Sequence, residues 1–539
     1  MTDTDANATA VAQAVAPSAA RWVVPLVLLL SAAGLAGFYV DHARQASLEI
    51  EGVRYFWLDD DQMISMRYAR NWADGLGLVW NAGERVEGYS NFLWVCVMAL
   101  VHLLHPPDAL ASVFLLAANY MLHVVLVGLS IALLRTLFPA GRLAIALVAA
   151  AIVFSLDILY WSANGFETTL LAVLQTAFLL SLLTRGERWH GCLALALIPL
   201  ARGDGAHIWV GDALLTLFLS KDRTRSLRWL GVSLLPMLAH FVGRRVYYGD
   251  WLPNTYYLKS QGLPDKTERG LMYAGRFLLR YGVLLAIGAG TAWHAARTDK
   301  RALALFTTVV PTLLYTVLVG GDNFDHSRFF THVLPVVCVF GVGAASALLT
   351  SKPGQVGLLA ALAVTLIPRT GIQGLYEPTV NGDPAIQVVV GVMLRQQALP
   401  DSSVAVIPAG FVPYFSRLRA IDLLGKSDAY IAHLPYAPGG HAAHGKYDPE
   451  YSFGRNPDLF VSCTRRVEAA QARQALEEAE TPGAEYRLAH LASEAFRTRY
   501  LRWRIDTPFL GSYSNIYTHQ GSPEFERRSQ WHDLEVVRP

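Results

Sequence analysis

The segment WVVPLVLLLSAAGLAGFYV (residues 22–40) contains no charged residue and is long enough to cross a lipid bilayer as a helix. Similar apolar runs recur as far as residue 369. Hydrophobic residues make up 53% of the 539-residue chain, and charged residues make up only 16%. A soluble protein carries about a quarter charged residues. The sequence therefore predicts a polytopic α-helical membrane protein.

Residues 22–40 are interpreted as a retained span rather than as a signal peptide. They exceed the usual length of a signal-peptide core, and no clear small-residue cleavage site follows them. Residues 1–21, rich in alanine, threonine and aspartate, are predicted to form a disordered cytoplasmic tail.

The charges of short loops set the orientation, because Lys and Arg are retained on the cytoplasmic side. Five short basic segments are placed inside: residues 135–142, 185–190, 221–228, 294–301 and 351–355. This orientation predicts about eleven transmembrane helices, with the N-terminus inside. The predicted spans are residues 22–40, 109–134, 143–161, 166–184, 191–203, 205–219, 227–243, 271–293, 303–319, 329–350 and 354–369.

One apolar stretch does not fit this orientation as a full span. A crossing at NFLWVCVMALVHLLHPP (residues 91–107) would turn every later basic loop outside. We therefore predict a helix lying on or dipping into the outer membrane face, with an ordinary short span as the alternative. Residues 191–219 are interrupted by ARGDG (residues 201–205), which predicts a broken pair of spans around a polar turn.

Continuous apolar runs end near residue 370. Beyond it, residues 403–408 and 458–463 have strand-like patterns, and residues 464–480 have a charged helical pattern. The sequence predicts a transmembrane domain over residues 22–369 and an extracytoplasmic soluble α/β or α+β domain over residues 370–539. The four cysteines form no CxxC pair and no metal-ligand spacing, and no nucleic-acid-binding motif appears.

The stretch LDDDQMISMRYARN (residues 58–71) follows the first span and carries three adjacent carboxylates, Asp59, Asp60 and Asp61. A helix N-cap needs one aspartate and is the simplest structural explanation. Three acids at the lipid–water boundary are costly, and crowded carboxylates raise one another's pKa, which suits a general base. The pattern indicates a functional site in the first outer loop, residues 41–108.

Two outer loops have compositions suited to a ligand. GLGLVWNAGERVEGYSNFLW (residues 75–94) is rich in glycine, aromatic residues and paired Glu and Arg, a combination that suits a sugar. The loop at residues 244–270 is basic, and beside a lipid surface it fits an anionic headgroup or phosphate. A solvated loop without a ligand is the alternative.

Two stretches of the first outer loop resemble the opening of the bacterial membrane arabinofuranosyltransferases: DDQMISMRYARN (residues 60–71) and GLGLVWNAGERVEGYSNFLW (residues 75–94). These enzymes complete cell-wall arabinan and belong to the glycosyltransferase-C superfamily. Further stretches resemble the same family in order: NGFETTLL (164–171), LPNTYYLKS (252–260), GGDNFDHSRFFTHVLP (320–335), AIDLLGKSDAYIAH (420–433) and GHAAHGKYDP (440–449). The chain departs from the family pattern at Met63, at the additional Asp59 and at ARGDG, where relatives often carry an Arg-Pro pair.

The resemblance implies a glycosyltransferase-C-like fold and a sugar-transfer reaction. The donor would be a polyprenyl-phosphate-linked arabinofuranose in the outer leaflet, and the acceptor an envelope polysaccharide or other glycan. An acid of the first loop would take the proton of the acceptor hydroxyl. Asp60 is the predicted base and Asp61 orients it or the acceptor, whereas a one-residue shift in register would give the role to Asp59.

The leaving phosphate needs positive donors. Lys259, His326 and Arg328 are the candidates on outer loops, with a structural histidine as the alternative for His326. Glu167 and Asp322 are predicted to hold sugar hydroxyls, or else to act as loop caps or ion-pair partners. The other predicted substrate-binding residues are Asp59, Arg67, Glu84, Glu87, Tyr89, Asn254 and Tyr256.

Other functions remain open at this point. A related transferase would use another polyprenyl-phosphate sugar on lipopolysaccharide or protein, and a lipid or sugar transporter would show repeated halves, which are not seen. A non-catalytic scaffold would not need acids and cations on one face. No metal or other cofactor is expected, and the predicted location is the cytoplasmic membrane, with the C-terminal domain outside.

Overall fold

The computed structural model describes residues 22–537, except residues 187, 260–264, 323, 325, 349–352, 355, 359–382, 438–443, 463–488, 491–492, 508–511, 533 and 535. The predictions for the tail at 1–21, for most of the span at 354–369 and for the helix at 464–480 lie outside the described residues.

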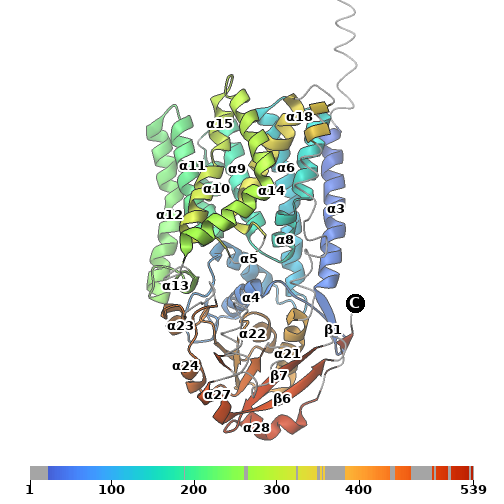
Figure 1. The fold of residues 1–539 in the computed structure, drawn as a ribbon, viewed down its shortest axis with the longest axis vertical. Helices are drawn as coiled ribbons and strands as arrows, with labels where there is room; N and C mark the ends of the chain where they lie inside the picture. The colour runs from blue at the N-terminus through green and yellow to red at the C-terminus, as the bar shows by residue number, and fades with distance from the viewer. Residues whose placement is uncertain are drawn as a thin grey trace, which may run out of the picture.

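Apolar helices form a bundle at one end of the molecule (Figure 1). Five helices are long and apolar enough to cross a membrane: α3 (Val23–Gln45), α6 (Ala111–Leu137), α9 (Thr168–Arg185), α14 (Lys266–Ala295) and the segment Lys300–Val319, which contains α15 (Lys300–Phe306) and α16 (Val309–Val319). A sixth span is obtained if α7 (Arg142–Val153) and α8 (Leu156–Ala163), bent by 46°, are counted together. The chain is therefore a multi-pass helical membrane protein.

The count of eleven spans is not confirmed, because several predicted spans are short or charged helices in the described part of the chain. These are α10 (Trp189–Ala201), α11 (Ala206–Leu219), α12 (Arg223–Tyr248), α17 (Leu334–Cys338) and α18 (Ala345–Leu348). α10 and α11 are separated by a 3-10 turn, Gly203–Gly205, so the broken pair around ARGDG is present.

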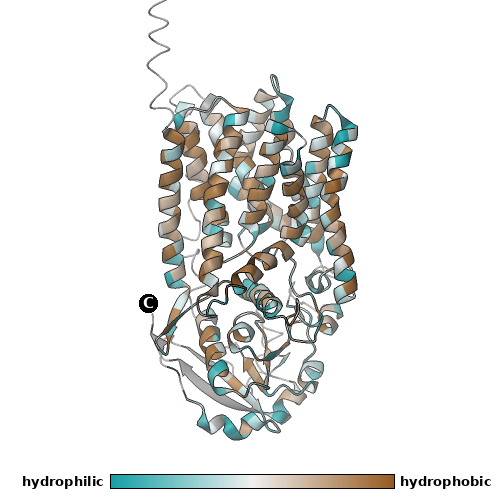
Figure 2. Ribbon diagram, turned by 180° about the vertical axis from the view of Figure 1, so that it is seen from behind, coloured by the Kyte–Doolittle hydropathy of each residue, from teal (hydrophilic) through white to brown (hydrophobic). Residues whose placement is uncertain are grey.

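The outside of the bundle is apolar and its inside is tightly packed. Large side chains such as Phe218, Leu279 and Leu318 are 68%, 72% and 74% exposed, as expected for surfaces that face lipid. Apolar residues cover the helices of the bundle, whereas the opposite end of the molecule is mixed (Figure 2). Gly341 and Gly343 lie in a π-helical turn, Val339–Ala344, where a Cβ would collide with the backbone of α14 and with side chains of α6 and α7.

The segment after α3, which is predicted above to be the first outer loop, forms two helices beneath the bundle, α4 (Asp60–Ala73) and α5 (Phe92–His102). It also forms a hairpin of β1 (Ser47–Ile50) and β2 (Val53–Phe56). α5 has 11 residues and rises about 16 Å, which is too short to cross a ~30 Å hydrocarbon core. This length agrees with the prediction that residues 91–107 are not a full span.

The C-terminal part of the chain contains a five-stranded mixed sheet, in the order β4-β3-β5-β7-β6. β3 (Ser403–Val406) pairs in parallel with β4 (Arg419–Asp422) and β5 (Leu459–Ser462), and β7 (Ser512–His519) pairs antiparallel with β5 and with β6 (Tyr500–Thr507). The helices around it are α21 (Asp383–Gln397), α22 (Phe411–Ser416), α23 (Ala429–His433), α24 (Pro449–Gly454), α27 (Glu494–Arg499) and α28 (Pro523–Arg527).

This sheet region is joined to the first outer loop by a shared core and a shared sheet. Val389, Phe411 and Tyr414 belong to the same continuous cluster of buried apolar residues as Ile64 and Tyr68 of α4. The last strand, β8 (Val536–Val537), pairs antiparallel with β1. The first outer loop and the C-terminal region therefore form one body under the bundle (Figure 1).

Candidate active site

A cavity of about 270 Å³ lies where the bundle meets the body formed by the first outer loop and the C-terminal region. Asp61, Gln62 and Ser65 of α4 line one side, and Arg202, Arg244 and Arg328 come from the bundle side. The loop around α13 (Asn254–Lys259) contributes Tyr256 and Lys259, and the C-terminal region contributes Lys426. Segments far apart in the sequence thus converge on one polar space.

The three adjacent aspartates have different partners, because successive residues at a helix start point in different directions. Asp59 is the N-cap of α4, and its carboxylate accepts the Asp61 N–H at 3.0 Å. The Asp60 carboxylate accepts the N–H groups of Gly410 and Phe411 at 3.0 and 3.1 Å. Among the three, Asp61 is the one that lines the cavity.

Two lysines hold the Asp61 carboxylate. The Lys426 Nζ lies 2.5 Å from Asp61 Oδ1, and the Lys259 Nζ lies 3.8 Å from Oδ2. Burial alone would raise the pKa of Asp61, but these two positive charges hold it well below its usual range. Burial, together with the charge of Asp61, raises the pKa of Asp60 to about 6. Asp61 is thus ionised at neutral pH and below it.

Another part of the cavity lining is rich in carboxylates. Arg202 contacts two carboxylates, Asp204 at 2.7 Å and Glu167 at 3.5 Å. The Asn91 amide donates to Glu167 at 3.2 Å. Two carboxylates share one guanidinium here, whereas two ammonium groups share one carboxylate around Asp61. The cavity therefore has a positive part and a negative part.

The predicted site residues divide into two groups. The residues that line the cavity are Asp61, Tyr89, Glu167, Tyr256, Lys259, Asp322 and Arg328. Arg328 donates to both oxygens of Asp322, at 2.6 and 2.9 Å. The residues that lie outside the lining are Asp59, Asp60, Arg67, Glu84, Glu87, Asn254 and His326.

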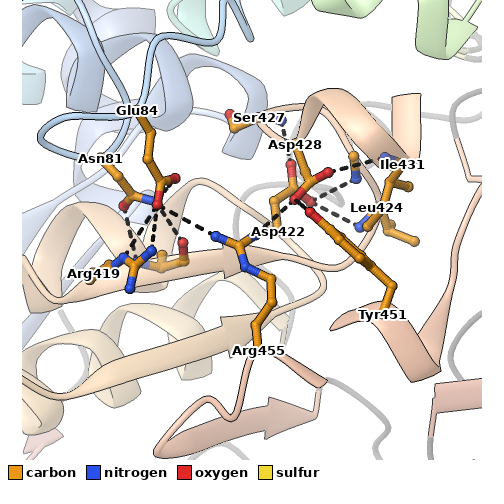
Figure 3. A network of polar contacts seen from close by, with 12 residues as sticks. Asn81, Glu84, Arg419, Asp422, Leu424, Ser427, Asp428, Ile431, Tyr451 and Arg455 are labelled. Atoms are coloured by element: carbon orange, nitrogen blue, oxygen red, sulfur yellow. Dashed lines mark hydrogen bonds and ion pairs between the residues drawn. The ribbon is translucent and has the colours of Figure 1, made fainter. Parts of the chain in front are cut away.

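Several residues of the second group form hydrogen bonds and ion pairs that connect the segments around the cavity. Arg67 is buried and donates to the carbonyls of Trp80, Pro413 and Leu418 and to the Asn81 amide oxygen. Glu87 pairs with Arg244 at 2.5 Å. Glu84 lies in a polar network with Asn81, Arg419 and Arg455 (Figure 3).

His326 belongs to a different cluster. Its Nδ1 lies 3.5 Å from the Asp157 carboxylate, and its ring stacks on Tyr160 with centroids 4.0 Å apart. Arg280 and Tyr281 also donate to Asp157, at 3.1 and 2.6 Å. The structure therefore places His326 with Asp157 rather than in the cavity.

Sequence reasoning missed several lining residues: Gln62, Asn91, Arg202, Asp204, His240, Arg244 and Lys426. Two signals were present. Arg202 and Asp204 lie in ARGDG, a polar turn between apolar runs, and Lys426 lies in AIDLLGKSDAYIAH, which resembles the family. The spacing of residues alone does not show that either stretch lines the same cavity as Asp61 of α4.

Comparisons with known proteins agree with this architecture. A family model described as a domain of unknown function (DUF8728) matches residues 379–514. The fold is shared with ArnT from Cupriavidus metallidurans bound to undecaprenyl phosphate, with a TM-score of 0.52 and 14% identity over 75% of this chain and 86% of that chain. An oligosaccharyltransferase from Archaeoglobus fulgidus gives a TM-score of 0.55 and 12% identity, and the match covers 93% of this chain and 75% of that chain. The fold class is therefore that of the glycosyltransferase-C enzymes.

Sequence relatives point to a more particular group. The chain is 30% identical, over 328 residues, to a terminal beta-(1->2)-arabinofuranosyltransferase of Corynebacterium glutamicum. This match covers 52% of this chain and 47% of that protein. It is 31% identical, over 266 residues, to the enzyme of the same name from Mycobacterium tuberculosis, and this match covers 45% of this chain and 41% of that protein. The match thus spans under half the length of these relatives. The predicted resemblance to arabinofuranosyltransferases is confirmed.

Proposed function

We propose that this protein is a membrane glycosyltransferase that transfers arabinofuranose from a polyprenyl-phosphate donor to a cell-envelope glycan. The observation that carries the proposal is the ionised Asp61 carboxylate between two lysines, in a cavity at the junction of an apolar bundle and a polar body. The names of the sequence relatives support the sugar. The undecaprenyl phosphate bound to ArnT, which shares the fold, supports the type of donor.

The proposed reaction is a displacement at the anomeric carbon of the donor sugar. A hydroxyl oxygen of the acceptor forms the new bond to this carbon, and the bond from the carbon to the phosphate oxygen breaks. The acceptor proton passes to Asp61, and polyprenyl phosphate leaves with the electron pair. Asp61 takes the role predicted for Asp60, because Asp61 lines the cavity and Asp60 is bonded to the Gly410 and Phe411 backbone.

The two parts of the cavity suit the two parts of the donor. The ammonium groups of Lys259 and Lys426 suit a phosphate, and Arg328 lines the cavity nearby. Glu167, Asn91 and Asp204 present acceptors and donors to sugar hydroxyls. In this arrangement the lipid tail of the donor lies against the apolar lining residues Met237 and Phe241 of α12.

The proposed setting is the outer face of the cytoplasmic membrane. The positions of the short basic loops support the eleven-span topology with the N-terminus inside, and the outer body then faces away from the cytoplasm. The acceptor would reach the cavity from this side, and the donor from the outer leaflet.

Transfer is expected to need no divalent metal, because two ammonium groups already pair with the Asp61 carboxylate. Adding EDTA in excess to the assay should leave the rate within about twofold of the untreated rate. A rate that falls more than about tenfold, and returns when Mg²⁺ or Mn²⁺ is added back, would contradict the metal-free mechanism.

The pH dependence separates the two candidate bases. With Asp61 as the base, its lowered pKa keeps the carboxylate ionised, so kcat/KM should stay nearly constant from pH 7 to pH 5. With Asp60 as the base, protonation near its pKa of about 6 would reduce kcat/KM by about tenfold at pH 5. Burial lowers the pKa of Lys259, so activity should fall on the alkaline side as this lysine loses its charge.

The donor is tested with membranes that contain the protein, a panel of radiolabelled polyprenyl-phosphate sugars, and the host envelope as acceptor. Consumption of the arabinofuranosyl donor alone would support the proposal in full. Consumption of another pentose, a hexose or aminoarabinose would retain the transferase and reject arabinose. Consumption of none would favour lipid transport, to be tested by translocation of the labelled donor.

A further inference from the structure

The turn that leads from the end of β4 to α23, residues 422–428, is held by hydrogen bonds within itself. The buried Asp422 carboxylate accepts three N–H groups of this loop, from Leu424 at 3.0 Å, Gly425 at 3.2 Å and Ser427 at 2.6 Å. Gly425 has φ = +79°, a conformation that favours glycine. The position of Lys426 is therefore fixed by the bonds of its own loop.

The rest of the protein also fixes this loop. The Asn254 amide nitrogen lies within hydrogen-bond distance of the carbonyls of Gly425, Lys426 and Asp428, at 2.9, 3.0 and 3.2 Å. At Gly88 of the first outer loop, a Cβ would lie 2.9 Å from the Lys426 carbonyl oxygen, so the two backbones are in close approach.

The far end of the loop is tied to the first outer loop by ion pairs. Arg455 donates to Asp428 at 2.8 Å and contacts Glu84 at 3.4 Å, and Glu84 pairs with Arg419 at 2.7 Å. Figure 3 shows Asp422 and Asp428 beside each other, with Arg455 between Asp428 and Glu84. None of the bonds in this network uses the Lys426 ammonium group.

The Lys426 side chain shares its counter-ion with another lysine. Arg244 and Arg328 each have a close carboxylate, on Glu87 and Asp322 respectively. Lys426 and Lys259 both contact Asp61, so two ammonium groups share one contacting carboxylate at the wall of the cavity. A phosphate that enters the cavity beside Asp61 would give these ammonium groups a second anionic partner.

We infer that Lys426 binds the phosphate of the lipid-linked donor, so that the C-terminal region supplies a catalytic residue. This inference rests on the proposed function. As the bond to the anomeric carbon breaks, negative charge grows on the phosphate oxygen, and the ammonium group of Lys426 stabilises it. The same ammonium group then no longer pairs fully with Asp61, which favours transfer of the acceptor proton to that carboxylate.

The test measures phosphate binding without turnover. Full-length protein in detergent is titrated with farnesyl phosphate, and separately with farnesol, while the unfolding temperature is followed. Lys426→Gln should weaken the binding of farnesyl phosphate by about tenfold or more. Lys426→Arg should retain most of the binding because it keeps the charge. The binding of farnesol should not change in either variant.

The matched control is Arg497→Ala, which removes an exposed positive charge from α27 of the same region. It should bind farnesyl phosphate as the wild type does. Equal binding by the wild type and Lys426→Gln, within about twofold, would overturn the inference and leave the proposed function in place. No binding of farnesyl phosphate by the wild type would contradict both.

If Lys426→Gln does not fold, the Lys426→Arg and Asn254→Ala proteins decide the question. Asn254→Ala releases the loop carbonyls without removing the lysine, so it should weaken the binding of farnesyl phosphate and leave that of farnesol unchanged. Unchanged binding of farnesyl phosphate in the Asn254→Ala protein would again overturn the inference.

Discussion

Replacing Asp61 by asparagine is expected to reduce sugar transfer by about 10²–10⁴-fold, the usual contribution of a general base. The amide keeps the size of the side chain and cannot take the acceptor proton. It also leaves Lys259 and Lys426 without their shared counter-ion, so donor binding should be retained or become tighter. The measurement is kcat and KM with the arabinofuranosyl donor, together with the unfolding temperature as a check of folding.

Asp60→Asn is the comparison for this variant. Its amide oxygen can still accept the N–H groups of Gly410 and Phe411, so the start of α4 should stay in place. We expect Asp60→Asn to lose less than about tenfold in kcat. A folded Asp60→Asn protein without activity, beside an active Asp61→Asn protein, would return the role of base to Asp60.

Replacing Arg67 by methionine is expected to destabilise the outer body by about 3–5 kcal/mol. The guanidinium connects α4 with the carbonyls of Trp80 and Leu418, at 2.6 and 2.8 Å, and with Pro413. Methionine preserves apolar volume and leaves these buried oxygens without a donor. The expected result is a large fall in the unfolding temperature in detergent, together with loss of activity.

The control for Arg67 is Arg54→Ala. Arg54 is 35% exposed and pairs with Glu49 at 3.4 Å on the surface of the β1–β2 hairpin. Such pairs contribute about 0–1 kcal/mol, so its loss should hardly change the unfolding temperature. Similar small changes in both variants would show that Arg67 does not join the first outer loop to the C-terminal region.

The helical membrane fold was predictable because apolar length is a local property of the sequence. The break at ARGDG and the short helix over Phe92–His102 followed from the same pattern together with the loop charges. The shared core of α4 and α22 was not predictable in this way. It depends on contacts such as that of Arg70 with Tyr414, two residues that are far apart in the chain and have no local signature.

The candidate site was predictable in its chemistry and less so in its assignments. Three adjacent acids indicated a site, but which of them faces the cavity depends on the residue at which α4 begins. Asp59 caps the helix, and this sets the directions of Asp60 and Asp61. Lys426 could not be paired with Asp61 from the sequence, because the loop that carries it is placed by Asp422 and Asn254.

The most direct test of the central proposal uses the purified protein, a radiolabelled polyprenyl-phosphate arabinofuranose and an arabinan acceptor. We predict that the label enters the acceptor, that one polyprenyl phosphate is released for each sugar transferred, and that Asp61→Asn slows both events by about a hundredfold or more. Equal transfer by the wild type and the folded Asp61→Asn protein would contradict the proposal. So would release of polyprenyl phosphate without a labelled acceptor.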